Sequence, residues 1–174
     1  MPRQGWDEGV VEESRSLVFR TDELVQAADG ELLCGVADRE FDDFSIDSRQ
    51  IGPGALFFAI KGDRFDGHDF VADAVRNGAA GVIISDPSAA VAAKVVDKQD
   101  VTVVVVKDTT RSLQTIARHV RRRSRARVVA ITGSIGKTTT KELSAAFIGI
   151  QRRVYRNIGN LNNHIGLPLS LLQL

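Results

Sequence analysis

One short stretch of the sequence carries the residue types that bind phosphate: Thr132-Gly133-Ser134-Ile135-Gly136-Lys137-Thr138-Thr139. Its two glycines let the backbone approach a phosphate chain closely, and a helix starting at this point adds the positive end of its dipole. Lys137 supplies a mobile cation for the terminal phosphates, and the Thr138 hydroxyl is placed to ligate Mg²⁺. The stretch therefore predicts a site for a nucleotide with its Mg²⁺.

The spacing is that of a shortened phosphate loop, because the first glycine of the strict pattern would fall at Ile131. A glycine-rich turn at the end of a strand would explain Gly133 and Gly136. It would not explain a Lys-Thr pair directly after them at a helix start. We therefore interpret the stretch as nucleotide-binding.

Such a loop needs a strand before it and a helix after it, and the flanking residues predict both. Residues 128–132 form an apolar run typical of a strand. Leu143, Ala146, Phe147 and Ile150 then follow at the spacing of an amphipathic helix. The loop is expected to join this strand to this helix.

Strand-like apolar runs also recur ahead of the loop. They cover residues 32–36, 44–46, 55–60, 81–85 and 101–106. The last of these runs is too uniformly apolar for a half-exposed strand, so we expect helices on both faces of the sheet.

Helices are expected between these strands. Thr21 can cap a helix through Ala28 that Gly30 ends, and Asp69 can cap another that Gly78 ends. A third helix follows a cap at Asp108 or Thr109, and its inner face is Leu113, Ile116, Ala117 and Val120. Strands and helices that alternate in this way predict a parallel α/β fold.

The composition restricts the kinds of partner. The chain has 23 Lys+Arg and 22 Asp+Glu, so no general field draws it to nucleic acid or an acidic membrane. No uncharged run approaches the ~18 apolar residues of a membrane span.

Residues 1–16 are polar and predict a flexible tail without a secretory signal. The single Cys34 is compatible with the cytoplasm. The basic run at 121–127 falls at a predicted helix end, where cations favour the helix dipole.

The stretch Gly133-Ser134-Ile135-Gly136-Lys137-Thr138-Thr139-Thr140-Lys141-Glu142 resembles the ATP loop of the Mur ligases. The resemblance covers about residues 17–174. Its other segments are Asp47-Ser48-Arg49, Pro53-Gly54-Ala55-Leu56-Phe57, Gly62 with Asp66-Gly67-His68-Asp69-Phe70, and Asn160-Leu161-Asn162-Asn163-His164-Ile165-Gly166-Leu167-Pro168-Leu169.

After the flexible tail (1–16), the resemblance implies a small α/β domain that binds a UDP-sugar (17–108) and the beginning of a P-loop, parallel-sheet ATPase domain (109–174). It implies ATP-dependent amide ligation in peptidoglycan precursor synthesis, with ATP and Mg²⁺ as cofactors. The form of the loop is most similar to members that add D-alanyl-D-alanine to UDP-N-acetylmuramoyl-tripeptide. In that chemistry a carboxylate is phosphorylated, an amine attacks the acyl phosphate, and phosphate leaves.

The resemblance also implies roles for individual residues. Lys137 and Thr138 take catalytic roles. Lys137 and a Mg²⁺ ion, for which Thr138 is the ligand, neutralise charge on the transferred phosphoryl group. The expected ATP-binding residues are Gly133, Ser134, Ile135, Gly136, Lys137, Thr138 and Thr139. The expected substrate-binding residues are Ser48, Arg49, His68, Asn163 and His164.

Each substrate residue also has a simpler structural interpretation. Ser48 and Arg49 could contact uracil or diphosphate, or only end a strand. His68 could contact substrate or only tie its loop together. Asn163 and His164 could lie near the ATP phosphates, or the asparagines of this segment could only form a polar turn. Ile135 and His164 depart from the family, since many relatives have a small polar residue and an acidic residue there.

Three other functions stay open. Within the family, the chain could belong to the ligase that adds the third residue of the peptide to a UDP-N-acetylmuramoyl-dipeptide, although Lys141-Glu142 argues against it. It could be a non-catalytic nucleotide-binding module, or a small P-loop kinase or GTPase. The long α/β region before the loop disfavours the last. An ATP site of this type also needs acidic ligands from later strands, so we expect this chain alone to be catalytically silent.

Overall fold

The computed structural model describes residues 18–96, 100–157 and 163–174. The expected tail at 1–16 lies outside these residues, as do Asn160 and Asn162 of the Asn-rich segment. Within the described ranges, no helix is both long enough and apolar enough to cross a membrane.

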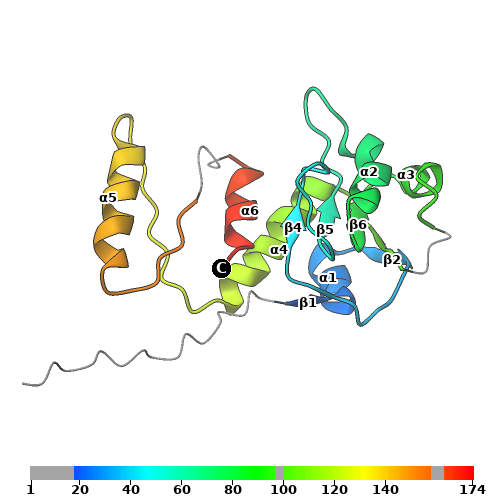
Figure 1. The fold of residues 1–174 in the computed structure, drawn as a ribbon, viewed down its shortest axis with the longest axis horizontal. Coiled ribbons are helices and arrows are strands. Elements are labelled where there is room, and N and C mark those ends of the chain that lie inside the picture. The colour runs from blue at the N-terminus through cyan, green and yellow to red at the C-terminus, as the bar shows by residue number, and fades with distance from the viewer. Residues whose placement is uncertain (1–17, 97–99, 158–162) are drawn as a thin grey trace, which may run out of the picture.

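A five-stranded sheet forms the centre of the amino-terminal part of the chain (Figure 1). Its strand order is β2-β7-β6-β5-β4; β4 to β7 run parallel, and β2 pairs antiparallel with β7 at one edge. The expected α/β class with a parallel sheet is confirmed. The strands are β2 (Glu31–Cys34), β4 (Phe44–Ser45), β5 (Leu56–Phe58), β6 (Gly81–Ile84) and β7 (Thr102–Val105), and β1 (Phe19–Arg20) pairs separately with β3 (Glu40–Phe41).

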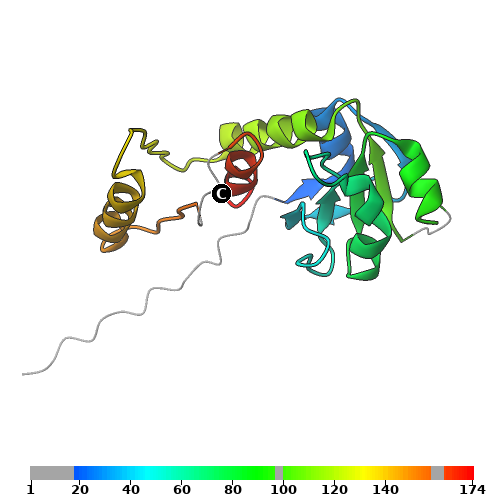
Figure 2. The same ribbon diagram turned by 90° about the horizontal axis from the view of Figure 1, so that it is seen from above.

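Helices lie on both sides of this sheet, as the apolar strands predict (Figure 2). Phe58, Ile83 and Val104 face one buried cluster, which α1 and α4 complete. The alternate residues of the same strands face a second cluster under α2 and α3. The helices are α1 (Thr21–Ala28), the 3-10 helix η1 (Gly67–Phe70), α2 (Val71–Arg76), α3 (Pro87–Ala92) and α4 (Thr109–Arg123).

Two of the expected helix caps are wrong, and tertiary contacts explain the first. Arg20, not Thr21, precedes α1, because the Thr21 hydroxyl donates instead to the carbonyl of Arg39 at 3.3 Å. The second cap is Asp66, whose carboxylate accepts the His68 amide N–H at 3.0 Å, so Asp69 lies inside η1.

The helix α4 begins as expected and belongs to the layered unit. The Asp108 carboxylate accepts the Arg111 amide N–H at 2.9 Å and so caps α4. Its apolar face, including Leu113 and Ile116, is buried against the sheet. The division of the chain at Asp108 stays a prediction, and the helix that follows it packs on the amino-terminal sheet.

The strand expected just before the phosphate loop does not form. Residues 128–132 are outside any strand, and the Val129 side chain is 69% exposed. A strand needs a neighbour for its N–H and C=O groups, and within the described ranges these residues have no strand partner. Helix α5 (Lys137–Gly149) does form, but its apolar residues Leu143 and Phe147 are exposed.

The last described segment returns to the layered unit. Helix α6 (Gly166–Leu171) packs against α4, and Leu172 is 1% exposed in the cluster that α1 and α4 form. The Gln114 side-chain amide donates to the His164 carbonyl at 2.9 Å. Figure 1 shows α6 beside α4 and α5 set apart from both. The two ends of the segment that carries α5 therefore both meet α4.

We predict that Leu172→Ala lowers the free energy of unfolding by about 2 to 5 kcal/mol, because it empties a buried site. Leu167, on the helix that Leu172 directly follows, is 53% exposed, so Leu167→Ala is the matched control with an effect within about 0.5 kcal/mol. Urea unfolding followed by circular dichroism measures both. Equal effects would contradict the docking of α6.

Candidate functional site

The phosphate loop has the backbone geometry that anion binding requires. Gly133 and Gly136 have φ of 149° and 80°, in the region that favours glycine. Gly136 is the N-cap of α5 and has no side chain to offer the first amides of the helix. Those amides have no partner within the helix and point toward its amino end, so they can donate to phosphate oxygens.

Lys137 lies over this loop. Its ammonium donates to the Gly133 carbonyl and, at 3.4 Å, to the Ser134 carbonyl. The side chain is exposed, so a phosphate group can reach the ammonium from solvent. The loop thus holds one cation beside the free helix amides.

The other expected loop residues are also accessible. Ser134, Thr138 and Thr139 are exposed, and the Ile135 side chain is 94% exposed at the tip of the loop. Thr138, in the first turn of α5, can offer Mg²⁺ one hydroxyl. The described residues include no cluster of three or more His, Cys, Asp or Glu side chains that could hold a metal alone.

An ionic network links α5 to the segment that follows it. Lys141 donates to the Asn157 carbonyl at 2.8 Å and lies 3.2 Å from Glu142. Glu142 also pairs with Arg156. Sequence reasoning missed Arg156, because a single arginine beyond a helix gives no pattern that names its partner.

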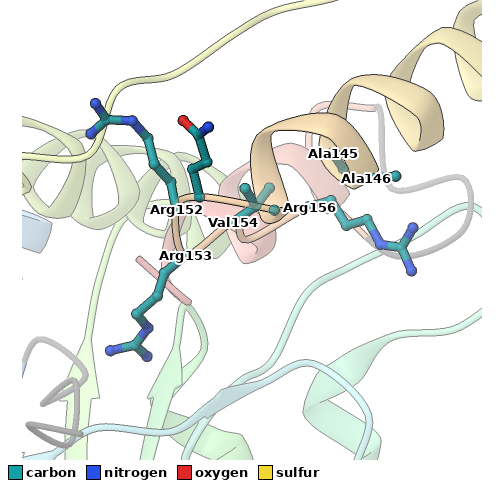
Figure 3. A pocket seen from close by; sticks show the side chains of 8 residues that line it. Ala145, Ala146, Arg152, Arg153, Val154 and Arg156 are labelled. Atoms are coloured by element: carbon teal, nitrogen blue, oxygen red, sulfur yellow. The ribbon is translucent and has the colours of Figure 1, made fainter. Parts of the chain in front are cut away.

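A cavity of about 860 Å³ lies at the carboxyl end of α5, away from the phosphate loop (Figure 3). It is lined by Arg152, Arg153 and Arg156 among other residues. In Figure 3 these arginines point away from one another. They therefore do not converge on a single anion.

The expected substrate residues of the amino-terminal part follow the carboxyl ends of parallel strands. Ser48 and Arg49 come after β4, and His68 comes after β5. Because β4 and β5 are parallel neighbours, these residues share one edge of the sheet. This edge is where open α/β sheets bind ligands.

Ser48 and Arg49 differ in exposure. Ser48 is buried, and its carbonyl accepts the Asn77 side-chain amide at 2.7 Å. The Arg49 side chain is 83% exposed and donates twice to Asp47, at 2.9 and 2.7 Å. These hydrogen bonds hold the pKa of the Asp47 carboxyl below its usual value. The guanidinium is therefore accessible and held in a fixed orientation.

His68 is engaged within the protein. Its Nδ1 lies 2.6 Å from an Asp66 carboxylate oxygen, and its Nε2 accepts the Ser85 amide N–H at 2.9 Å. The side chain is 10% exposed. Both ring nitrogens are thus occupied, which favours the loop-tying interpretation over direct substrate contact.

Asn163 and His164 lie where α6 meets α4. The Asn163 side-chain oxygen accepts the amides of Ile165 and Gly166 at 3.2 and 2.7 Å, which forms the expected polar turn. The His164 carbonyl accepts from Gln114, while its side chain is exposed. Their contact with ATP phosphates stays a prediction. The structure thus holds two groups of candidate residues, one at the sheet edge and one around α5.

Two family models match the chain. The Mur ligase family catalytic domain matches residues 41–121, and the Mur ligase middle domain matches residues 131–174. Together they cover most of the sequence and include both groups of candidate residues.

Curated relatives with similar sequences are named UDP-N-acetylmuramoyl-tripeptide–D-alanyl-D-alanine ligase. The Escherichia coli protein is 41% identical over 138 residues, which are 79% of this chain and 28% of that protein. The Bacillus subtilis protein is 39% identical over 74% of this chain and 27% of its own length. The chain therefore spans between a quarter and a third of these relatives.

Solved structures agree with the sequence matches. A crystal structure of MurF from Acinetobacter baumannii has a TM-score of 0.78 and 33% identity, and covers 92% of this chain and 34% of that one. MurF ligase from Thermotoga maritima, solved in complex with ADP, has a TM-score of 0.62 and 37% identity, over 75% of this chain and 29% of that one.

We predict that Arg49→Gln raises the pKa of Asp47 toward the ordinary aspartate value of about 3.9, because the hydrogen bonds that lower it are lost. In the wild type, the stabilisation from this carboxylate is full above the ordinary value and is lost as pH falls through the lowered pKa. NMR titration of the side-chain carboxyl carbon measures both proteins. Arg76→Gln, which removes another exposed arginine paired with an aspartate, is the control and leaves Asp47 unchanged.

Proposed function

This chain belongs to the Mur ligase family, and on that premise we propose that it supplies the UDP-sugar-binding and ATP-loop parts of a ligase. The ligase joins D-alanyl-D-alanine to UDP-N-acetylmuramoyl-tripeptide in the cytoplasm, as a step of peptidoglycan precursor synthesis. The observation that carries this proposal is the phosphate loop at the start of α5, in a chain 41% identical to the Escherichia coli enzyme of that name.

The loop geometry suits activation of a carboxylate. A carboxylate is a poor electrophile until a phosphoryl group gives it a leaving group, after which the amine of D-alanyl-D-alanine can attack the acyl carbon. We assign the α5 amides and Lys137 to binding the ATP phosphates and offsetting charge on the γ-phosphoryl oxygens. Mg²⁺, when bound through Thr138 and the phosphates, would supply further charge neutralisation. The Thermotoga maritima relative was solved in complex with ADP, which supports an adenine nucleotide as a ligand of this chain.

The sheet edge suits the other substrate. An exposed, oriented guanidinium such as that of Arg49 can pair with a diphosphate through two parallel hydrogen bonds. We assign Arg49 and Ser48 to the UDP end of UDP-N-acetylmuramoyl-tripeptide. Asn163 and His164 lie at the junction of α6 with α4 and follow the ATP-loop segment in the sequence. We assign them to contact with the ATP phosphates.

Lys137→Ala is expected to weaken ATP binding by tenfold or more, since a hydrogen bond to a charged group contributes about 1.5 to 3 kcal/mol. Isothermal titration calorimetry of the whole 174-residue chain with Mg-ATP gives the Kd. Lys107→Ala is the control, because Lys107 is 91% exposed and only 3.8 Å from the equally exposed Asp29. Unchanged affinity in the Lys137 variant would contradict the loop assignment.

Binding of UDP-N-acetylmuramoyl-tripeptide tests the ligase assignment. We expect the chain to bind it in calorimetry, and Arg49→Gln to weaken binding about tenfold through loss of one bidentate phosphate contact. Arg76→Gln should bind like the wild type. No detectable binding at millimolar ligand would overturn the ligase proposal and favour a nucleotide-binding module of another kind.

Phosphate release separates the two ligases of the family. A longer protein that carries this chain should release phosphate from ATP only when UDP-N-acetylmuramoyl-tripeptide and D-alanyl-D-alanine are both present. Release that requires the UDP-dipeptide and a free amino acid instead would show the ligase that adds the third residue. We expect the 174-residue chain alone to bind substrates without turnover.

A further inference from the structure

His68 connects two loops that the sequence places far apart. Its Nε2 is 2.9 Å from the Ser85 amide nitrogen, and a backbone N–H can only donate. Nε2 must therefore accept, and the ring proton lies on Nδ1, which donates to Asp66 at 2.6 Å. The geometry defines one tautomer of a neutral imidazole with both nitrogens in use.

The Asp66 side of this link closes the turn that follows β5. The Gly62 amide donates to the Phe65 carbonyl and the Gly67 amide to the Ile60 carbonyl, both at 2.9 Å. Asp66 also caps η1 by accepting the His68 amide. Residues 61–66 therefore form a closed turn whose carboxylate is held by His68 itself.

Backbone packing fixes the same turn from its other side. A Cβ atom added at Gly67 would lie 2.6 Å from the Ile60 nitrogen and 2.7 Å from the Ala59 carbonyl carbon. The turn therefore lies directly against the chain leaving β5. On the side toward β6, the His68 side chain joins the turn to Ser85, the residue that follows the strand.

The Ser85 side of the link belongs to the next strand of the sheet. Ser85 directly follows β6, and Asp86 caps α3 by accepting the Ser88 amide at 2.9 Å. Three neighbouring parallel strands thus end in three loops, which carry Arg49, the turn at 61–66, and Ser85. His68 fastens the middle loop to the third.

We propose that His68 is a positioning residue, which orders the turn at 61–66 for the UDP-sugar without contacting it. This inference rests on the proposed function of the sheet edge. Ordering a loop during binding costs free energy and weakens affinity. A link that orders the loop beforehand therefore raises the affinity for the UDP-sugar. ATP affinity depends on the separate loop at α5 and should not respond.

Three substitutions separate the two hydrogen bonds of the ring. His68→Ala removes both, His68→Gln can keep an acceptor near Nε2 for the Ser85 amide, and His68→Asn can keep a donor near Nδ1 for Asp66. We expect His68→Ala and His68→Asn to weaken UDP-N-acetylmuramoyl-tripeptide binding about tenfold, and His68→Gln to restore most of it. His119→Gln, at an exposed histidine on α4, is the control and should leave the Kd of both ligands unchanged.

Calorimetry of the full chain with each ligand measures the effect, and an unchanged Kd for Mg-ATP shows that each variant retains the ATP loop. Amide hydrogen exchange at Ser85 reports the link directly and should speed up in His68→Ala and His68→Asn. Faster exchange with unchanged UDP-sugar affinity would overturn the positioning role. Equal loss of both ligands would also overturn it, since it would indicate general destabilisation.

The ring nitrogens distinguish positioning from contact. In ¹⁵N NMR of the wild type, we expect the Nδ1-protonated tautomer, with the Nε2 signal unchanged when the UDP-sugar is added. A ligand-dependent change in Nε2 would show direct contact and overturn the proposal. A different result would refute the proposed function itself: the wild type binds no UDP-sugar, yet NMR finds the Nδ1-protonated tautomer and hydrogen exchange finds a protected Ser85 amide. The hydrogen-bonded link would then exist, but it would have no role in UDP-sugar binding.

Discussion

A parallel sheet must be covered on both faces, and this constraint organises the amino-terminal part of the molecule. Strands β5 to β7 alternate their side chains between two buried clusters, so both helix layers are required. The parallel direction also brings the strand ends to one edge. The loops with Arg49, His68 and Ser85 are neighbours for that reason, although β5 separates the first two in the chain and α2 and β6 separate the last two.

The phosphate loop depends on a different and more local constraint. Its conformation requires two glycines at positive φ and a helix that begins without a side-chain cap. Neither condition needs a neighbouring strand. The loop and α5 therefore form although residues 128–132 are unpaired within the described ranges and the apolar face of α5 is exposed.

This difference explains how much the sequence could predict. Continuous apolar runs identified β6 and β7, and the spacing of Leu113 and Ile116 identified α4, because burial alone dictates those patterns. The prediction that Thr21 caps α1 was wrong because the Thr21 hydroxyl donates instead to the carbonyl of Arg39, eighteen residues away. At the site, the loop glycines and Lys137 could be predicted because their local sequence pattern is typical of phosphate binding. No pattern in the sequence indicates that Ser85 is the partner of His68, since only the order of strands in the sheet brings them together.

The docking of α6 on α4 has a mechanical consequence. The segment with the phosphate loop leaves from the end of α4 and returns to the same helix through Leu172 and the Gln114–His164 hydrogen bond. The described part of this segment is therefore held to one helix at both of its ends. Loss of the Leu172 contact and the Gln114–His164 hydrogen bond would leave the nucleotide loop joined to the sheet only through the chain that leaves α4 at Ser124.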